Sequence, residues 1–337
     1  MWRSFEDDQA RRAGDTFYGN AALRPAPNPM PLTQAEHIAL VIPTLNAGRH
    51  LDRLVPALAS QTLRPGRFLV VDSGSSDGTP EVLAQAGATV RAIAQETFDH
   101  GGTRQMAVEM LPEAEVVIFL TQDAVPADRE SLANLIRPFA EPTVGVTYGR
   151  QLPQPGAGPL ASHARLFNYP EQSHVRSLAD VPRFGVKTAF CSNSFAAYRR
   201  RALLDVGGFP APSVHGEDML AVAALLKGGW TVHYVADARV YHSHDYTAAQ
   251  TFRRYFDIGV LHATSWDRLV QFGTPEGEGW RFLRSEMAYL AERKPGLIPD
   301  AMWHTLCKYA AYRLGLLQSW LPLQIKRKLG MNSGYWG

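Results

Sequence analysis

The chain has 337 residues, of which 45% are hydrophobic and 20% charged, and its formal net charge is +2. This composition excludes a disordered or collagen-like protein and suits a globular protein with one large or two ordinary domains. Its two cysteines, Cys191 and Cys307, are too few for a disulfide framework or a four-cysteine zinc site. They are typical of a reducing compartment, so we expect a cytoplasmic protein.

Residues 1–36 contain a proline-rich stretch, ALRPAPNPMPLTQ, and lack the apolar core of a signal peptide. We therefore predict an N-terminal arm or linker here, and no export. The longest apolar runs, VVIFL and MLAVAALL, are much shorter than the roughly 20 residues that a membrane-spanning helix needs. The chain is expected not to cross a membrane.

From His37 onward, apolar runs alternate with segments of helical periodicity. Strands are predicted at residues 37–42, 68–71, 89–93, 116–121 and 144–148. Helices are predicted around residues 51–58, after the loop SGSSDGT, at residues 102–111 and from about Ser131. This alternation indicates an α/β protein with a parallel sheet covered on both faces, whose ligands bind beyond the carboxyl ends of the strands.

Two aspartates directly follow predicted strands, Asp72 in LVVDSGSSDGT and Asp123 in VVIFLTQDA. Each alone could be a helix cap or a turn former. Both belong to the same edge of the sheet, where a nucleotide would bind. The chain lacks a Gly-x-Gly-x-x-Gly fingerprint and a Walker lysine, which argues against dinucleotide-binding and P-loop folds.

Two further segments offer charged candidates. In FDHGGTRQ, the paired glycines allow close backbone approach and Arg104 could bind a phosphate or a base edge, although Thr103 could simply cap a helix. In GEDMLAVAALLKGGW, Glu217 and Asp218 open an apolar helix. The helix dipole favours carboxylates there in any protein, and it also keeps such a carboxylate ionised for use as a general base.

The segment RVYHSHDYT places His242 and His244 two residues apart, so that on a strand they would share one face. They could bind one metal ion or be structural histidines hydrogen-bonded to the backbone. A hard cation that is held by oxygen ligands and one imidazole, and that bridges a diphosphate, is the more plausible metal.

Residues 301–337 contain no aspartate or glutamate. Their basic residues are Lys308, Arg313, Lys326, Arg327 and Lys328, interleaved with several tryptophans and tyrosines. This pattern indicates a surface for a membrane or an anionic ligand, or else an ordinary packed helix with solvated lysines. Nucleic acid is not expected as a partner, because no basic stripe runs through the rest of the chain.

An ordered set of motifs resembles inverting family 2 glycosyltransferases over roughly residues 38–245. These motifs are VIPTLNAG, VVDSGSSDGT, LTQDA, FCSNSFAAYRRRALLDVGGFP and GEDMLAVAALLKGGW. Three further segments, FDHGGTRQ, YHSHDYTAAQTFRRYFDIG and KRKLGMNSGYW, are similar to bacterial rhamnosyltransferases of that family. The resemblance implies a GT-A fold, with a Rossmann-like nucleotide-binding half and a mixed, mainly parallel sheet.

The resemblance also implies a division of the chain. The arm at 1–36 would precede a GT-A domain at 37–250, with a nucleotide-sugar-binding half at 37–150 and an acceptor-binding, catalytic half at 151–250. A helical, basic region would follow at 251–337.

Roles for individual residues follow from the same resemblance. The residues that would contact the nucleotide are Pro43, Thr44, Asp72, Arg104 and Gln122. Asp218 would be the catalytic base with Glu217 as its neighbour. Asp123 and His242, with His244 in reserve, would bind Mg²⁺ or Mn²⁺. Many relatives have Asp-x-Asp where this chain has Gln122-Asp123-Ala124, so the site has one charge fewer and metal affinity is expected to be lower.

The implied reaction moves L-rhamnose, with inversion, from dTDP-β-L-rhamnose to a hydroxyl of a glycan acceptor. The acceptor would be carried on a polyprenyl diphosphate during synthesis of a bacterial surface polysaccharide such as O-antigen, capsule or exopolysaccharide. The basic, aromatic tail would hold the enzyme peripherally at the inner face of the cytoplasmic membrane. The alternatives are a family member that uses a UDP- or GDP-linked sugar, a metal-dependent hydrolase and a non-catalytic sugar-nucleotide-binding subunit. A nucleotidyltransferase would need a glycine-rich loop with Arg and Lys after the first strand, which VIPTLNAG does not supply.

Overall fold

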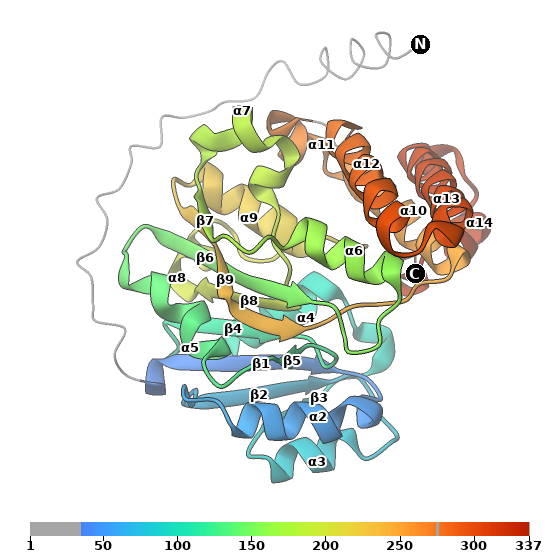
Figure 1. Cartoon of the computed structure of the whole chain (residues 1–337). Coiled ribbons are helices and arrows are strands. Elements are labelled where there is room, and N and C mark those ends of the chain that lie inside the picture. Colours follow the sequence, from blue (N-terminus) through green and yellow to red (C-terminus); the bar gives the residue numbers. More distant parts are fainter. Residues whose placement is uncertain (1–34, 274–275, 337) are drawn as a thin grey trace.

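A nine-stranded sheet forms the centre of the computed structural model, which describes residues 35–273 and 276–336 (Figure 1). The strand order is β3-β2-β1-β4-β8-β6-β9-β5, with β7 paired to β9. The strands are β1 (Ile38–Thr44), β2 (Arg67–Asp72), β3 (Thr89–Ala92), β4 (Val116–Leu120), β5 (Val125–Pro126), β6 (Val144–Leu152), β7 (His174–Arg176), β8 (Phe195–Arg199) and β9 (Thr231–Tyr241). Nearly all of the predicted arm at 1–36 lies outside the described residues.

The sheet is mixed but mainly parallel, as predicted. β1, β2, β3 and β4 run parallel to one another, and β9 runs parallel to β6. β8 lies between β4 and β6 and is antiparallel to both, while β5 and β7 are antiparallel to β9. The carboxyl ends of β1, β2, β4, β6 and β9 therefore meet at one edge of the sheet, and β8 begins at that edge.

Strand β1 shows why both faces of the sheet are covered. Successive side chains of a strand point to opposite faces. Ala39 and Val41 accordingly lie in one core, and Ile38, Leu40 and Ile42 lie in the other. The helices that pack in the first core are α4 (His100–Glu109), α8 (Arg200–Asp205), α9 (Glu217–Lys227) and α10 (Ala248–Thr264). Those that pack in the second core are α2 (Gly48–Ala59), α3 (Thr79–Gln85) and α5 (Ser131–Ile136).

Helices dominate the part of the chain that follows β9, and Figure 1 shows them in orange and red to one side of the sheet, near α6 (Pro159–Asn168). After α10 come α11 (Trp266–Leu269), α12 (Glu276–Arg293), α13 (Ile298–Leu316) and α14 (Leu323–Leu329); the short α7 (Val181–Phe184) precedes β8. Helices α10 and α13 touch through glycines, because a Cβ on Gly259 would lie 2.3 Å from the carbonyl oxygen of Tyr312. Among the described residues, none of the helices combines the length and hydropathy that a membrane crossing requires.

Both predicted internal boundaries fall inside regular elements. The boundary at 150/151 lies within β6, so the two predicted halves share one strand of the sheet. The boundary at 250/251 lies in the first turn of α10, whose buried residues Phe256, Val260 and Leu261 belong to the core that the sheet forms with α4 and α9. The helical region is therefore packed into the same core as the sheet.

Candidate functional site

The loops that follow β1 and β2 are joined by side chains that bind backbone groups. Asp72, only 3% exposed, accepts hydrogen bonds from the Thr44 hydroxyl (2.8 Å) and from the N–H of Ser75 (2.9 Å). The Asp77 carboxylate accepts one from the N–H of Gly48 at 2.8 Å. The hydrogen bond between Thr44 and Asp72 thus joins the ends of β1 and β2 at the carboxyl edge of the sheet. Pro43, the residue before Thr44, lies opposite Val71 in the pairing of β1 with β2.

Gln122 ties the loop after β4 to the loop after β1. Its Oε1 accepts the N–H of Leu45 at 2.8 Å, and its Nε2 donates to the Leu45 carbonyl at 3.0 Å. An ionised carboxylate at this position could not donate the second bond. This reciprocal pair gives a physical reason for glutamine where many relatives carry an aspartate.

Asp123, His242 and His244 lie together at the same edge. Asp123 follows β4, and its two carboxylate oxygens lie 3.4 Å from Nε2 of His242 and 3.5 Å from Nε2 of His244. One potential ligand atom from each residue falls within 4.8 Å of the others. These residues were predicted as metal ligands, and the structure brings all three to a place where they could hold one ion.

The protonation of this cluster suits a metal ion. Burial opposes the ionisation of Asp123, but the hydrogen bond and charge of His242, together with His244, hold the pKa of Asp123 well below its usual range. Burial and the neighbouring His242 lower the pKa of His244 to about 4, so its ring is neutral at pH 7 and keeps a lone pair. One oxygen ligand and two imidazoles are donors that a divalent transition metal accepts.

The orientation of the His242 ring is set by Gln151, at the end of β6. The Nδ1 of His242 lies 2.9 Å from Oε1 of Gln151, and both side chains are more than nine-tenths buried. Because an amide oxygen can only accept, Nδ1 carries the hydrogen, and Nε2 is the ring nitrogen that faces Asp123 and could bind a metal ion. Gln151 is thus positioned to support a metal ligand.

Replacing Gln151 with leucine is expected to weaken Mn²⁺ binding about 10–100-fold, the usual cost of losing the residue that orients a histidine ligand. Gln151→Glu is the matched control, because it keeps an oxygen that accepts the Nδ1 hydrogen. Titration of the purified variants with Mn²⁺, followed by electron paramagnetic resonance, measures the effect. Equal affinity of the wild-type and leucine proteins would show that Gln151 does not orient a ligand.

Asp218 and Glu217 open α9 in different surroundings. The Asp218 carboxylate accepts the N–H of Asn193 (3.1 Å) and the N–H of Met219 (2.8 Å). Glu217, which is 4% exposed, accepts a hydrogen bond from the Asn193 side-chain amide at 3.0 Å. Its Oε1 also lies 3.2 Å from the guanidinium of Arg104. Asn193 therefore contacts both carboxylates.

These surroundings separate the two pKa values. Burial, together with the negative charge of Glu217, raises the pKa of Asp218 to about 7. Burial also opposes the ionisation of Glu217, but Arg104, with His100 and His215 nearby, lowers the pKa of Glu217 to about 2. A carboxylate that titrates near neutral pH and lies next to one that stays ionised has the properties of a general base.

Arg104 lies with this carboxylate pair. Its guanidinium contacts Glu217 and donates to the backbone carbonyl of His100 at 2.9 Å. The predicted role of Arg104 beside the nucleotide base stays a prediction. Its pairing with Glu217 has an electrostatic reason, because the buried Glu217 carboxylate needs a cation and Arg104, only 4% exposed, supplies it.

Residues just before β8 connect the metal cluster to the carboxylate pair. Gln151, which orients His242, also donates from Nε2 to the Ser192 hydroxyl at 3.0 Å. The next residue, Asn193, holds Asp218 and Glu217. Ser192 and Asn193 belong to FCSN, a motif to which we assigned no role, and neither their position nor that of Gln151 follows from periodicity.

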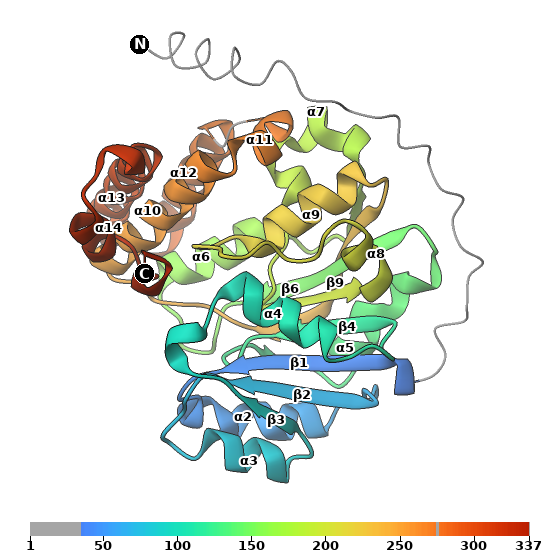
Figure 2. The same cartoon turned by 180° about the vertical axis from the view of Figure 1, so that it is seen from behind.

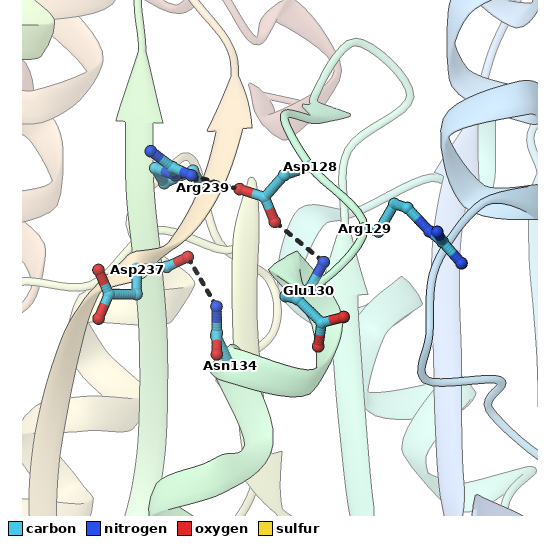
Figure 3. Close-up of a pocket in the computed structure, with 6 residues that line it drawn as sticks. All are labelled: Asp128, Arg129, Glu130, Asn134, Asp237 and Arg239. Atoms are coloured by element: carbon cyan, nitrogen blue, oxygen red, sulfur yellow. Dashed lines mark hydrogen bonds and ion pairs between the residues drawn. The ribbon is translucent and has the colours of Figure 1, made fainter.

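A separate hollow of about 530 Å³ lies at the start of α5 beside β9 (Figure 3). Two contacts join residues that line it: Arg239 pairs with Asp128 at 2.8 Å, and the side-chain amide of Asn134 donates to the backbone carbonyl of Asp237 at 3.1 Å. None of the predicted site residues lines it. We therefore place the functional site at the carboxyl edge of the sheet and not in this hollow.

The fold places a cluster that could hold a metal ion, Asp123 with His242 and His244, and the buried carboxylate pair of Glu217 and Asp218 at the carboxyl edge of one α/β sheet. The model of glycosyl transferase family 2 matches residues 39–207. The chain is 43% identical over 300 residues to the O-antigen chain rhamnosyltransferase RfbN of Salmonella typhimurium, covering 89% of this chain and 96% of that protein. It is 40% identical over 298 residues to the O-antigen chain rhamnosyltransferase WbaN of Salmonella anatum, covering 88% and 95%. The chain belongs to glycosyl transferase family 2.

Solved structures support the fold. The mannosyltransferase PcManGT from Pyrobaculum calidifontis, solved with GDP-Man and Mn²⁺, superposes with a TM-score of 0.52 at 21% identity, over 89% of this chain and 84% of that one. S. aureus TarS 1-349 in complex with UDP-GlcNAc superposes with a TM-score of 0.50 at 16% identity, over 84% and 91%. The predicted GT-A fold is confirmed.

Proposed function

We propose that this glycosyltransferase moves L-rhamnose from dTDP-β-L-rhamnose to a hydroxyl of a glycan acceptor in O-antigen synthesis. The observation that carries the proposal is the similarity to RfbN and WbaN. It covers the cluster of Asp123, His242 and His244 and the carboxylate pair of Glu217 and Asp218, and it extends into the helical region. The acceptor that we propose is carried on a polyprenyl diphosphate.

In the proposed mechanism Asp218 takes the proton of the acceptor hydroxyl as that oxygen attacks the anomeric carbon. Attack opposite the leaving nucleotide inverts the configuration, so a β-linked donor yields an α-linked product. Arg104 keeps Glu217 ionised, and the charge of Glu217 in turn keeps the pKa of Asp218 high enough for proton transfer at neutral pH. Thr44, Asp72 and their loops would shape the nucleotide pocket.

Asp123, His242 and His244 would hold a divalent cation, which when bound supplies positive charge to the departing diphosphate. We propose Mn²⁺ in preference to Mg²⁺, because two of the three protein ligands are imidazoles and Mg²⁺ prefers oxygen ligands. The Mn²⁺ in the PcManGT structure agrees with this choice.

A panel of nucleotide sugars tests the reaction. The protein is incubated with Mn²⁺, a lipid-linked acceptor fraction and dTDP-rhamnose, UDP-glucose, UDP-GlcNAc or GDP-mannose, and release of nucleoside diphosphate is followed. Acceptor-dependent release from dTDP-rhamnose alone is the expected result. Release from another donor would replace the proposed sugar, and equal release without acceptor would indicate a hydrolase. Donor binding without any release would indicate a sugar-nucleotide-binding subunit.

We also propose that the helical region binds the surface of an anionic membrane. Exposed apolar side chains recur every three residues on α13 at Trp303, Leu306 and Tyr309, and again after the helix at Leu317, Trp320 (82% exposed) and Leu323. The same stretch, residues 301–337, has basic residues and no acidic one, which suits anionic headgroups. We call this set the aromatic-basic surface.

Vesicle binding is expected to depend on this surface. The protein should sediment with vesicles that contain phosphatidylglycerol, less with pure phosphatidylcholine, and less again as salt is raised. The double variant Trp303→Ser, Trp320→Ser should lose most of this binding. Met110→Ser, at an exposed apolar residue of the GT-A domain, is the control. Equal sedimentation with neutral and anionic vesicles would refute the proposal.

A further inference from the structure

Residues 330–336, which follow α14, fold back against residues 213–218, which comprise the loop before α9 and the first two residues of that helix, Glu217 and Asp218; we call residues 213–218 the catalytic loop. The side-chain amide of Asn332 donates a hydrogen bond to the backbone carbonyl of Val214. Figure 2 shows this dark red end of the chain turning back from α14 toward the side of the sheet on which α4 lies. Asn332 thus touches the catalytic loop directly.

Asp257, on α10, anchors residues 330–336. One of its carboxylate oxygens accepts the N–H groups of Met331 and Asn332, each at 3.0 Å, and the residue is 2% exposed. Gly330 permits this approach, because a Cβ there would lie 2.7 Å from the other Asp257 oxygen. A buried carboxylate that receives two backbone N–H groups fixes the path of the segment over Val214.

The same face of α10 also holds the catalytic loop. Leu261 lies one turn after Asp257, and its side chain sits 2.4 Å from where a Cβ on Gly216 would be. Gly216 has a φ of +73° and is the residue that caps the start of α9. Any other residue at position 216 would have a strained backbone, and its side chain would collide with Leu261. One helix face therefore positions both residues 330–336 and the loop.

Helix α4 holds the loop through a different set of contacts. The N–H of Ser213 donates to the Asp99 carboxylate at 2.8 Å, and the Ser213 hydroxyl accepts the N–H of Gly101 at 3.1 Å. Val214 is 2% exposed. Residues 213–216 have no regular structure of their own, so contacts with α4, α10 and residues 330–336 contribute to where α9 begins and where its first carboxylates lie.

We infer that residues 330–336 position the catalytic loop, and that Asn332 and Asp257 are positioning residues for sugar transfer. This inference rests on the proposed role of Asp218 as the base. Loss of either contact lets the loop shift, and a displacement of about 1 Å in a catalytic group can lower a rate by about 10²-fold. Binding of the nucleotide sugar should change little, since the loops after β1 and β2 take no part in these contacts.

The test compares Asn332→Ala and Asp257→Ala with two controls. Asp257→Asn keeps an oxygen that accepts the two N–H groups, and Ser333→Ala alters an exposed neighbour in the same segment. Both alanine variants are expected to lower kcat about 10–100-fold, with the KM for the nucleotide sugar changed by less than about threefold. Hydrogen–deuterium exchange should be faster in the peptide that spans residues 213–218. Asp257→Asn and Ser333→Ala should behave like the wild type.

Folded alanine variants with unchanged kcat and unchanged exchange at 213–218 would overturn the inference. A loss of kcat that merely follows a loss of folded protein, seen as a matching fall in the circular dichroism signal, would overturn it too. A wild-type protein that transfers no sugar would instead refute the proposed function. The exchange measurement then decides whether residues 330–336 hold the loop.

Discussion

Asp218→Asn is expected to lower kcat by about 10²–10⁴-fold while leaving the affinity for the nucleotide sugar within a few-fold of the wild type. The loss corresponds to about 3–5 kcal/mol of transition-state stabilisation. Asparagine keeps the shape of the side chain and one of the two oxygens that accept the N–H groups of Asn193 and Met219, so the loop should stay close to its place. What disappears is the group that takes the acceptor proton. Steady-state transfer and donor-binding calorimetry measure the two quantities.

The pH profile of the wild type provides the control for this assignment. A base must be ionised to act, and burial beside Glu217 raises the pKa of Asp218 to about 7. The transfer rate should therefore fall about tenfold per pH unit as the pH drops below about 7, and this limb should be absent from the residual activity of Asp218→Asn. Near-normal turnover of Asp218→Asn, or an unchanged acid limb, would assign the base to another group.

Asp123→Asn is expected to produce the second large effect. The change removes the only negative charge of the cluster that Asp123 forms with His242 and His244, so Mn²⁺ affinity should fall by at least about 10²-fold. The rate of transfer at a fixed, low Mn²⁺ concentration should fall with it. In the wild type, removal of metal with EDTA should abolish transfer, and added Mn²⁺ should restore it more fully than Mg²⁺ does.

Two results would count against this metal site. One is wild-type transfer that continues unchanged after exhaustive chelation. The other is Asp123→Asn with the Mn²⁺ dependence of the wild type. Asp77→Asn serves as the matched control, because Asp77 lies in the loop after β2 and its carboxylate is bound by Gly48 and Thr79. That variant should keep the wild-type metal dependence.

Much of the parallel part of the sheet could be predicted from the sequence, because strands such as β1, β2 and β4 are continuous apolar runs; β9, which is also parallel, was not predicted as a strand. The five predicted strands are present as β1, β2, β3, β4 and β6. β5 and β7 were not predicted, because two or three residues are too short to show a period. β8 has small and aromatic residues in FAAYR, and its antiparallel place between β4 and β6 is a tertiary property. Only the resemblance implied a mixed sheet.

The predicted metal ligands were found together because each follows a strand that ends at the shared edge. Asp123 follows β4, and His242 directly follows β9. The position of Arg104 could not be predicted, since it depends on a partner, Glu217, that lies 113 residues away and is equally buried. Gln151 and Asn193 were missed for the same reason: their side chains bind groups that only the fold brings near.

The contact between Asn332 and Val214 joins residues 118 positions apart and has a consequence for the order of events during synthesis. A contact of such separation closes a long loop, whose entropic cost is met only once the intervening helices have packed. On the ribosome, the sheet, the histidines proposed to bind metal and the carboxylates proposed to act in catalysis are all made before residue 332. The nascent chain therefore has these groups before it has the contact that we infer to position them. The inference predicts that transfer gains its last 10–100-fold, about the loss expected for Asn332→Ala, only after residues 330–336 have been made and have packed against the loop.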